Sequence, residues 1–241
     1  MHREIHHWYS PRLNKEMPLS LYGHYGPVLL LIPTAAADYL EYERFGLLDS
    51  IQSFLEAGKV KVVSIDSINR ESWLCDDMPF VLRSRRHEEW NQYVFEEVVP
   101  FIRNNCSPET PIYPCGASFG ALHAINLFLK RPDLLQGAMA FSGVYNLMAY
   151  TKGYYDDLVY YNSPSHYVPN MHDHSSLERI RAGKIVLATG SGDYEDPNAS
   201  RDFGNVLQTK SIPHLLSVWG PEWKHDWPTW KAMMPWILKE L

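Results

Sequence analysis

The sequence predicts an α/β fold in which helices cover both faces of a mostly parallel central sheet. Short apolar runs rich in β-forming residues alternate with longer helical patterns from residue 27 to the end of the chain. No internal repeat, low-complexity tract or linker interrupts this alternation. The chain has 241 residues, of which 45% are hydrophobic and 21% charged, so it can build one large core but is short for two. We therefore expect a single domain over residues 1–241.

Six apolar runs are expected to form the parallel strands, and five helical patterns separate or follow them. The strands are expected at 27–32, 60–65, 112–115, 138–141, 184–189 and 214–219, and the helices at 47–57, 88–103, 119–130, 200–209 and 227–241. Residues 4–9 and 17–22 flank a turn that contains Pro11, and they are expected to form an N-terminal antiparallel strand pair. Pro114 conflicts with the pattern, because proline has no N–H to donate inside a central strand.

The segment Gly116-Ala117-Ser118-Phe119-Gly120 has the G-x-S-x-G pattern of a nucleophile elbow, a sharp turn from a strand into a helix. The serine at such a turn has strained dihedral angles, and only small residues fit on either side of it. The mostly apolar residues 119–130 are typical of a buried helix, as the motif requires. Ser118 would then lie at the positive end of a helix, where the Phe119 amide can stabilise an oxyanion.

A serine hydroxyl becomes a nucleophile at neutral pH only when a histidine takes its proton and an acid orients that histidine. The acid is expected to follow the serine and precede the histidine, each in a loop after a strand. Asp193 lies in the turn-rich loop after the run 184–189, and His225 follows the last expected strand. Asp193 is the expected acid, but Glu195 and Asp196 share its loop, and an aspartate beside glycine is also a common turn former.

Three segments together resemble a known group of proteins. They are GASFG at 116–120, LATGSGD at 187–193, and the closing WG, HDW and W within 219–230. On these segments the chain resembles the esterase branch of the α/β-hydrolase superfamily, which includes esterase D and the enterochelin-esterase-like proteins. The resemblance implies an intracellular serine hydrolase that acts on esters, with Ser118 as nucleophile, Asp193 as acid and His225 as base.

The resemblance also implies an oxyanion hole made of two backbone amides. One belongs to Phe119, the residue after the nucleophile, and the other to the loop after an early strand. Here that loop is Pro33-Thr34-Ala35-Ala36-Ala37, so Ala35 is the expected second donor. Many relatives have a glycine-rich segment at this loop, whereas this chain has three alanines.

Residues 144–175 are expected to form a tyrosine-rich insertion near the site, because this part of the chain contains seven tyrosines. A tyrosine offers a flat apolar face with a polar tip, which suits an aromatic or sugar-bearing ligand. Tyr145, Tyr154 and Trp223 are the expected substrate contacts, although structural packing explains these aromatic residues about equally well.

Composition argues against several other classes of function. The formal net charge is −6, and the one dense basic run, 83–86, is expected to be a solvated helix start, so nucleic acid is not an expected partner. A polar N-terminus and the lack of a long apolar run predict a cytoplasmic protein without membrane contact. The three cysteines and the pair His172 and His174 lack metal-ligand spacing, so neither a metal nor another cofactor is expected.

The sequence therefore predicts a carboxylesterase-type serine hydrolase that cleaves a small-molecule ester through an acyl-enzyme intermediate. Two alternatives stay open: an acyltransferase that uses the same residues, and a non-catalytic binding protein with a hydrolase-like fold. The chain could also assemble as a homo-oligomer, which its sequence does not decide.

Overall fold

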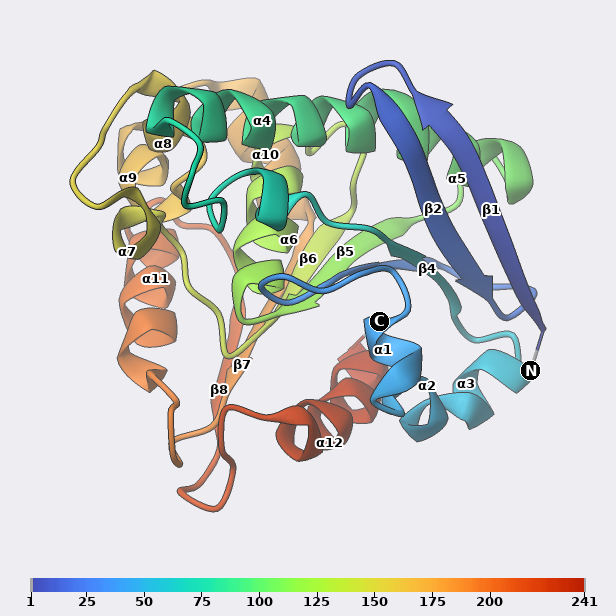
Figure 1. The fold of residues 1–241 in the computed structure, drawn as a ribbon. Helices are drawn as coiled ribbons and strands as arrows, with labels where there is room; N and C mark the ends of the chain where they lie inside the picture. Colours follow the sequence, from blue (N-terminus) through green and yellow to red (C-terminus); the bar gives the residue numbers. More distant parts are fainter. Residues whose placement is uncertain (1, 241) are drawn as a thin grey trace.

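The computed structural model describes residues 2–240 and contains an eight-stranded sheet with the order β1-β2-β4-β3-β5-β6-β7-β8 (Figure 1). The strands are β1 (Arg3–Ser10), β2 (Lys15–Tyr22), β3 (Val28–Ile32), β4 (Lys61–Ile65), β5 (Ile112–Ala117), β6 (Gly137–Phe141), β7 (Lys184–Thr189) and β8 (Leu215–Val218). Strands β3 to β8 pair in parallel, whereas β2 pairs antiparallel with both β1 and β4. The mostly parallel sheet and the N-terminal antiparallel pair confirm the predicted fold class.

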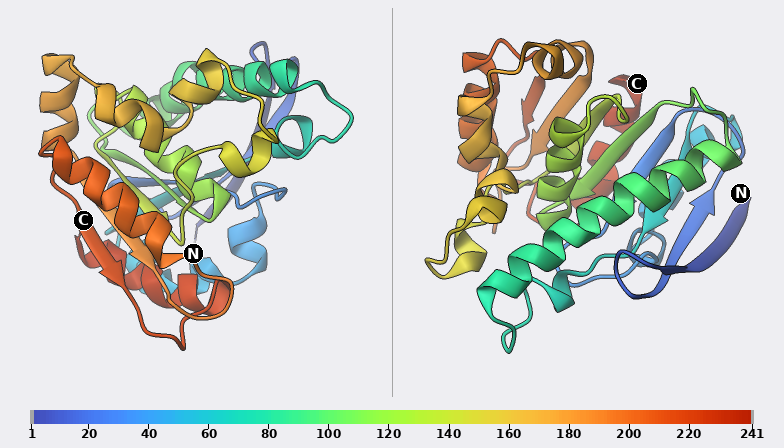
Figure 2. Two further views of the ribbon diagram at one scale, coloured as in Figure 1. Left: turned by 90° about the vertical axis from the view of Figure 1, so that its left-hand side faces the viewer. Right: turned by 90° about the horizontal axis from the view of Figure 1, so that it is seen from above.

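Helices lie on both faces of the sheet (Figure 2). They are α1 (Glu41–Arg44), α2 (Leu47–Ser50), α3 (Gln52–Glu56), α4 (Phe80–Tyr93), α5 (Val99–Asn105), α6 (Phe119–Lys130), α7 (Met148–Thr151), α8 (Asp157–Tyr161), α9 (Pro164–Tyr167), α10 (His174–Ala182), α11 (Pro197–Thr209) and α12 (Trp227–Ile237). A π-helical segment, η2 (Val94–Val98), joins α4 to α5, and short 3₁₀ turns lie at η1 (Asn69–Glu71), η3 (Val168–Asn170) and η4 (Leu238–Glu240). Within residues 2–240, no helix combines the length and apolar character that crossing a membrane requires.

Two hydrophobic clusters, one on each face, hold the sheet between its helices. Alternate residues of a strand point to opposite faces, so Leu30 and Ile32 pack with α4, α5, α6, α10 and α11, whereas Leu29 and Leu31 pack with α1–α3 and α12. All five residues of β3 are buried, as expected for a central parallel strand that is covered on both sides.

Pro114 fits its strand because the pairing between β5 and β6 starts one residue later. The first pair of that ladder is Cys115 with Met139, whereas Pro114 lies opposite Leu30 of β3. The proline therefore removes no hydrogen bond from the interior of the β5–β6 ladder.

The basic run 83–86 is not a solvated helix start, and this prediction is wrong. Helix α4 begins at Phe80, and Arg83 within it is only 3% exposed. Its guanidinium donates to the carbonyls of Met78 at 2.7 Å and Asp76 at 2.9 Å, and it lies 4.4 Å from the centre of the Phe80 ring. Backbone carbonyls and an aromatic face thus replace the water that we expected around this charge.

The parallel topology brings four loops to one edge of the sheet. Parallel strands all end at the same edge, so the residues after β5, β6, β7 and β8 are neighbours in the order of the strands. These loops contain Ser118, Ser142, the segment 190–196 and the segment 219–226. Every residue of the expected triad lies at this edge.

Candidate active site

Ser118 lies at a strained elbow between β5 and α6. Its dihedral angles are φ 55° and ψ −118°, and its N–H donates to the Phe141 carbonyl at 2.9 Å. A Cβ added to Gly116 would lie 2.4 Å from backbone atoms of Gly120, and one added to Gly120 would lie 2.4 Å from the Ile32 carbonyl oxygen. The chain therefore needs glycine on both sides of the serine, as the motif predicts.

The carboxylate that faces His225 belongs to Glu195, not to Asp193. The Nδ1 atom of His225 lies 3.4 Å from Oε2 of Glu195, whose side chain is fully buried. The Asp193 side chain is 65% exposed and pairs with Lys224 at 2.6 Å. Asp196 accepts hydrogen bonds from the first backbone amides of α11, so it is the N-cap of that helix. The structure thus corrects the expected partner of the histidine from Asp193 to Glu195.

Three further groups hold Glu195. Its Oε1 atom accepts hydrogen bonds from the Ser142 hydroxyl at 2.5 Å and the Gly190 N–H at 3.2 Å, and its Oε2 atom accepts from the Thr189 hydroxyl at 3.1 Å. Burial by itself raises the pKa of Glu195, but the hydrogen bonds from His225 and Ser142 outweigh it, and the net pKa is lowered. Glu195 is therefore held as a buried carboxylate anion beside the imidazole.

Ser142 and Trp230 belong to the same cluster. Trp230 lies in the closing segment on which the sequence resemblance rests, whereas no motif indicated Ser142. The Trp230 indole N–H donates to the Ser142 hydroxyl at 3.0 Å, and its ring meets the His225 ring edge to face at 5.2 Å. Ser142 follows β6 with a φ of 46°, a left-handed conformation that is uncommon for serine. Trp230 thus contacts the histidine directly and Glu195 through the Ser142 hydroxyl.

Neighbouring strand ends place Ser118 beside this cluster. The Ser118 N–H binds Phe141, and the next residue, Ser142, binds Glu195. Glu195 occupies Nδ1 of His225 and leaves Nε2 as the ring nitrogen available to a hydroxyl. Among residues 2–240, no hydrogen bond joins the Ser118 hydroxyl to His225, and such bonds are often long in active sites without a ligand.

The loop 33–37 passes close to the elbow, and three side chains fix it. Its close approach is seen at Gly120, where a Cβ would lie 2.6 Å from the Pro33 carbonyl oxygen. The carbonyls of the three alanines each accept a hydrogen bond from the segment after β4. The donors are Asn69 to Ala35 at 2.6 Å, Arg70 to Ala36 at 2.8 Å and Ser67 to Ala37 at 2.9 Å. The loop is thus held by side chains, although it lacks the glycines of many relatives.

In the described part of the chain, the two amides expected to form the oxyanion hole have no hydrogen-bond acceptor. Phe119 is the first residue of α6, so its N–H has no acceptor within that helix. Ala35 is exposed, and within the described residues neither its N–H nor that of Phe119 makes a recorded hydrogen bond. Both donors are therefore available to an oxygen atom at the elbow.

Tyr145 is a core residue, which corrects its expected role as a substrate contact. It is 2% exposed, its ring stacks on Phe203 at 4.4 Å, and its hydroxyl lies 3.2 Å from that of Ser200. Trp223 is partly exposed and packs against Trp219 with ring centres 4.8 Å apart. The Trp223 carbonyl accepts the Gly192 N–H at 2.9 Å, so this residue holds the loop that contains Glu195.

Tyr154 and Tyr150 belong to a small aromatic cluster around Phe119. Tyr154 stacks on Phe80 at 5.8 Å, and its hydroxyl donates to Asp156 at 2.7 Å. Tyr150 stacks directly on the Phe119 ring at 4.4 Å and is partly exposed. Of the tyrosines in 144–175, Tyr150 thus contacts the residue that follows Ser118.

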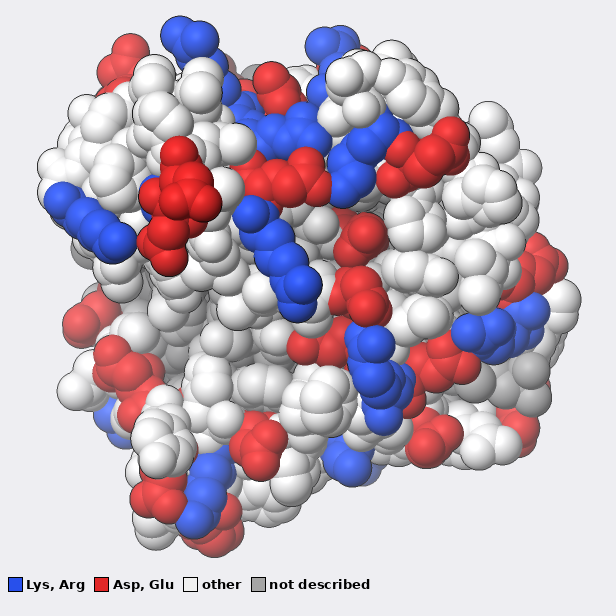
Figure 3. Space-filling model, in the orientation of Figure 1, with Lys and Arg blue, Asp and Glu red and all other residues white. Residues whose placement is uncertain are grey.

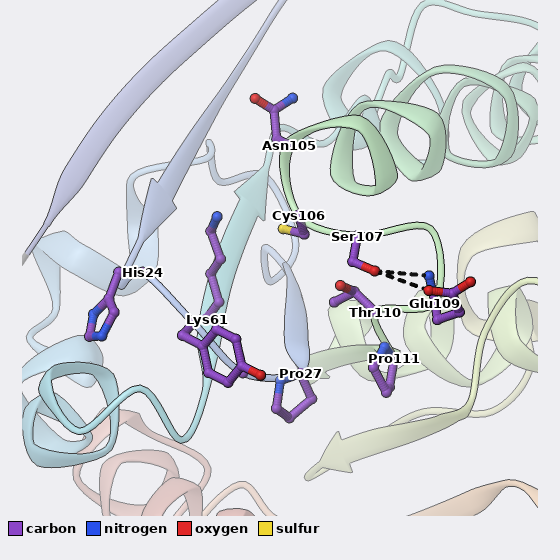
Figure 4. Close-up of a pocket in the computed structure, with 11 residues that line it drawn as sticks. His24, Pro27, Lys61, Asn105, Cys106, Ser107, Glu109, Thr110 and Pro111 are labelled. Carbon is purple, nitrogen blue, oxygen red and sulfur yellow. Dashed lines mark hydrogen bonds between the residues drawn. The ribbon is translucent and has the colours of Figure 1, made fainter.

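Two cavities of the structure lie away from the elbow. One of about 440 Å³ lies at the opposite edge of the sheet, where its lining includes Lys61, Asn105 and Cys106 (Figure 4). Another of about 490 Å³ lies between Lys130 at the end of α6 and the segment 158–176. A third cavity, of about 370 Å³, borders the loop 33–37.

Charges of both signs are interspersed on the face shown in Figure 3. Ion pairs of the structure include Arg44–Asp38, Lys15–Glu71 and Arg86–Glu71. Within residues 2–240, no three His, Cys, Asp or Glu side chains are arranged to hold a metal ion.

The α/β-hydrolase class is defined by a G-x-S-x-G elbow on a central parallel strand, with a carboxylate and a histidine after later strands. Here these are Ser118 after β5, Glu195 after β7 and His225 after β8. The chain belongs to the Putative esterase family, whose model matches residues 10–241. This family membership makes the protein a hydrolase of the esterase type and confirms the resemblance predicted from the sequence.

Solved structures with the same fold include several esterases and hydrolases. A ferulic acid esterase is 17% identical with a TM-score of 0.74, over 98% of this chain and 96% of the other. S-formylglutathione hydrolase (FrmB) from Staphylococcus aureus is 15% identical with a TM-score of 0.70, over 100% and 99%. Fluorophosphonate-binding serine hydrolase F from the same organism is 16% identical with a TM-score of 0.66, over 99% and 97%. Among curated protein sequences, none matches this chain.

Proposed function

We propose that this protein hydrolyses carboxylic esters through an acyl-enzyme intermediate, with Ser118 as nucleophile, His225 as base and Glu195 as acid. The observation that carries the proposal is the contact between Nδ1 of His225 and the buried Glu195 carboxylate, at the same sheet edge as the strained Ser118 elbow. Burial of a charge is costly, so packing alone does not explain a buried carboxylate that accepts hydrogen bonds from four donors.

In the first half of the reaction, Nε2 of His225 takes the Ser118 proton while the serine oxygen bonds to the ester carbonyl carbon. The carbonyl oxygen becomes negative and accepts hydrogen bonds from the Phe119 and Ala35 amides. The tetrahedral intermediate collapses, the bond to the leaving alcohol breaks, and His225 returns its proton to that alcohol. Glu195 stabilises the imidazolium in between and remains a carboxylate.

In the second half, water replaces the alcohol. His225 takes a proton from the water molecule as the water oxygen bonds to the acyl carbon. The bond between that carbon and the Ser118 oxygen then breaks, the acid leaves, and His225 returns its proton to the serine oxygen. The partly exposed Tyr150 stacks on the buried ring of Phe119, the residue next to Ser118, so an aromatic face lies near the elbow. We infer an ester with an aromatic or similarly flat group, and the ferulic acid esterase of the same fold supports that class.

The direct experiment measures hydrolysis of p-nitrophenyl acetate and methyl ferulate by the wild type and by Ser118→Ala. The proposal expects the variant to fold like the wild type by circular dichroism and to lose roughly 10³-fold or more in kcat. Retention of wild-type turnover by the variant would exclude Ser118 as nucleophile. Product analysis with an added alcohol separates hydrolysis from acyl transfer, because a hydrolase gives mainly the free acid and a transferase mainly the new ester.

A further inference from the structure

Two buried histidines lie beneath the loop 33–37, outside the proposed triad. His87 in α4 is fully buried, and His123 in α6 is 2% exposed. Their ring centres are 4.7 Å apart with the planes at 87° (the two helices are neighbours in Figure 1). Neither histidine contacts Ser118, His225 or Glu195 in any recorded hydrogen bond, so the proposed mechanism gives them no role.

The hydrogen bond from Trp73 determines which nitrogen of His87 carries the proton. The indole Nε1 of Trp73 lies 3.0 Å from Nδ1 of His87, and an indole nitrogen can only donate. Nδ1 of His87 must therefore accept, and the proton of the neutral ring is on Nε2.

The same reasoning fixes His123 through Asn69. The Asn69 amide nitrogen donates to the Ala35 carbonyl at 2.6 Å, which leaves its Oδ1 atom to face Nε2 of His123 at 3.0 Å. Because an amide oxygen can only accept, Nε2 of His123 carries the proton. Nδ1 of His123 is then a bare acceptor.

Both rings are neutral, which this assignment requires. Burial lowers the pKa of His123 to about 3, and burial followed by the proximity of His123 and Lys130 lowers the pKa of His87 well below its ordinary value. A neutral imidazole has one donor and one acceptor nitrogen, so each ring has one of its two nitrogens left to satisfy.

The two remaining nitrogens are complementary. Nε2 of His87 and Nδ1 of His123 are buried, and neither has a partner within the described residues. Nε2 of His87 is a donor and Nδ1 of His123 is an acceptor, and the two rings are in contact. A direct bond, after a small rotation, or one bridging water satisfies both, and buried polar groups without a partner are rare.

We propose that Trp73, His87, His123 and Asn69 form a one-way chain of hydrogen bonds that holds the Ala35 carbonyl. Every N–H in the chain points toward the loop 33–37, so each bond polarises the next. The bond from Asn69 to the Ala35 carbonyl fixes the peptide plane between Ala35 and Ala36. The Ala35 N–H, on the other side of the same Cα, is the donor proposed for the oxyanion. His123 and His87 are thus positioning residues. The hydrogen bonds themselves do not depend on the proposed function, but the expected effect on the rate rests on the proposed ester hydrolysis.

Nuclear magnetic resonance of protein labelled with ¹⁵N-histidine tests the chain without reference to activity. His87→Gln and His123→Gln assign the two rings among the 11 histidines of the sequence. We expect both wild-type rings to carry the proton on Nε2, to show hydrogen-bonded Nδ1 shifts, and to remain unprotonated from mildly acidic to mildly alkaline pH. A proton on Nδ1 of His123, or protonation of either ring in that range, would overturn the direction of the chain.

Kinetics of paired variants test the positioning role. His123→Leu removes both hydrogen bonds, whereas His123→Gln keeps one donor and one acceptor. We expect His123→Leu to lower kcat roughly 10- to 100-fold with little change in KM, and His123→Gln to recover most of the loss. Asn69→Asp cannot donate to the Ala35 carbonyl, so we expect it to lower kcat as His123→Leu does. It replaces His123→Leu in the test if that variant does not fold.

Asn126→Leu is the matched control. Asn126 is also buried in α6 and bonds to Asn162 at 2.7 Å and to Tyr167 at 3.0 Å, outside the chain. Equal kcat values for His123→Leu, Asn126→Leu and the wild type would refute the positioning role. If instead Ser118→Ala keeps its activity, the proposed function fails, and the resonance experiment still decides the hydrogen bonds.

Discussion

At the scale of single residues, the identity of the carboxylate that faces His225 is the main result that the sequence did not predict. The loop after β7 contains Asp193, Glu195 and Asp196, and only the backbone conformation selects among them. Tyr194, between the first two, has a φ of 63° and is 93% exposed. This left-handed residue turns the chain so that Asp193 points to solvent and Glu195 points inward.

Substitution of each carboxylate separates the two candidates. We expect Glu195→Gln to lower kcat by roughly 10²- to 10⁴-fold, because an amide cannot stabilise the imidazolium as a carboxylate does. Asp193→Asn, the matched control in the same loop, should stay within a few-fold of the wild type, because Asp193 is exposed and pairs with the exposed Lys224 rather than with His225. Steady-state kinetics on one ester measures kcat for both variants. A large loss in Asp193→Asn with little loss in Glu195→Gln would restore Asp193 as the acid.

Asp66 gives a prediction about pH and stability. Burial raises its pKa to about 6, above the ordinary value of aspartate in an unfolded chain. The folded state therefore binds this proton more tightly, so its contribution to stability is complete at low pH and is lost as pH rises through about 6. We expect Asp66→Asn to raise the free energy of unfolding at neutral pH but not near pH 4, roughly the pKa of free aspartate.

Urea unfolding of the wild type and Asp66→Asn at both pH values measures this effect. The side-chain oxygen of the introduced asparagine can still accept the Ser67 N–H that Asp66 accepts at 3.0 Å, so the substitution removes the charge without removing that bond. An equal difference in stability at the two pH values would show that the charge of Asp66 is not responsible.

At the scale of secondary structure, the elbow and its helix were predictable from the sequence because their causes are local. The glycine spacing and the apolar run gave the bounds of α6 correctly, whereas α4 begins eight residues before the expected start at 88. The basic run 83–86 hid that start, because the burial of Arg83 depends on the carbonyls of Asp76 and Met78. Residues 47–57 likewise form two short helices with a break at Ile51, whose φ is −118°.

The elbow glycines provide a prediction at this scale. Gly120→Ala places a Cβ 2.4 Å from the Ile32 carbonyl, where only backbone could move, so we expect a loss of roughly 3 kcal/mol or more in the free energy of unfolding. Gly153→Ala is the control: its φ is 91°, but no atom lies within 4 Å of the added Cβ, so about 1 kcal/mol is expected. Denaturant unfolding compares them, and similar losses would contradict the contact argument.

At the scale of the whole molecule, parallel pairing was predictable, whereas the contacts between loops were not. Ser142 belongs to no motif, and Trp230 lies in the closing motif segment far from it in the sequence. The two meet because β6 ends beside the start of α12. The hydrogen-bonded chain from Trp73 to Ala35 likewise joins four segments. Local sequence patterns predict strands and helices. Contacts between residues of distant loops depend instead on how the sheet and its helices pack against each other.

Hydrogen exchange measures how stability is distributed over the sheet. Strands β3, β5 and β6 are central and almost wholly buried, whereas β8 is an edge strand with partly exposed side chains, and β1 is the other edge. We expect the amides of the central strands to exchange slowest, with β1 and β8 opening first. Uniform protection across all eight strands would contradict this picture and indicate a single cooperative opening.

The central claim is that Ser118 is activated by His225 and Glu195. Reaction with a fluorophosphonate followed by intact-mass measurement and peptide mapping tests it most directly, because only an activated serine attacks such a probe at a useful rate. We predict one adduct per chain, located on Ser118, absent in Ser118→Ala and formed far more slowly in His225→Ala and Glu195→Gln. An unmodified wild type, or an adduct on another residue, would contradict the account.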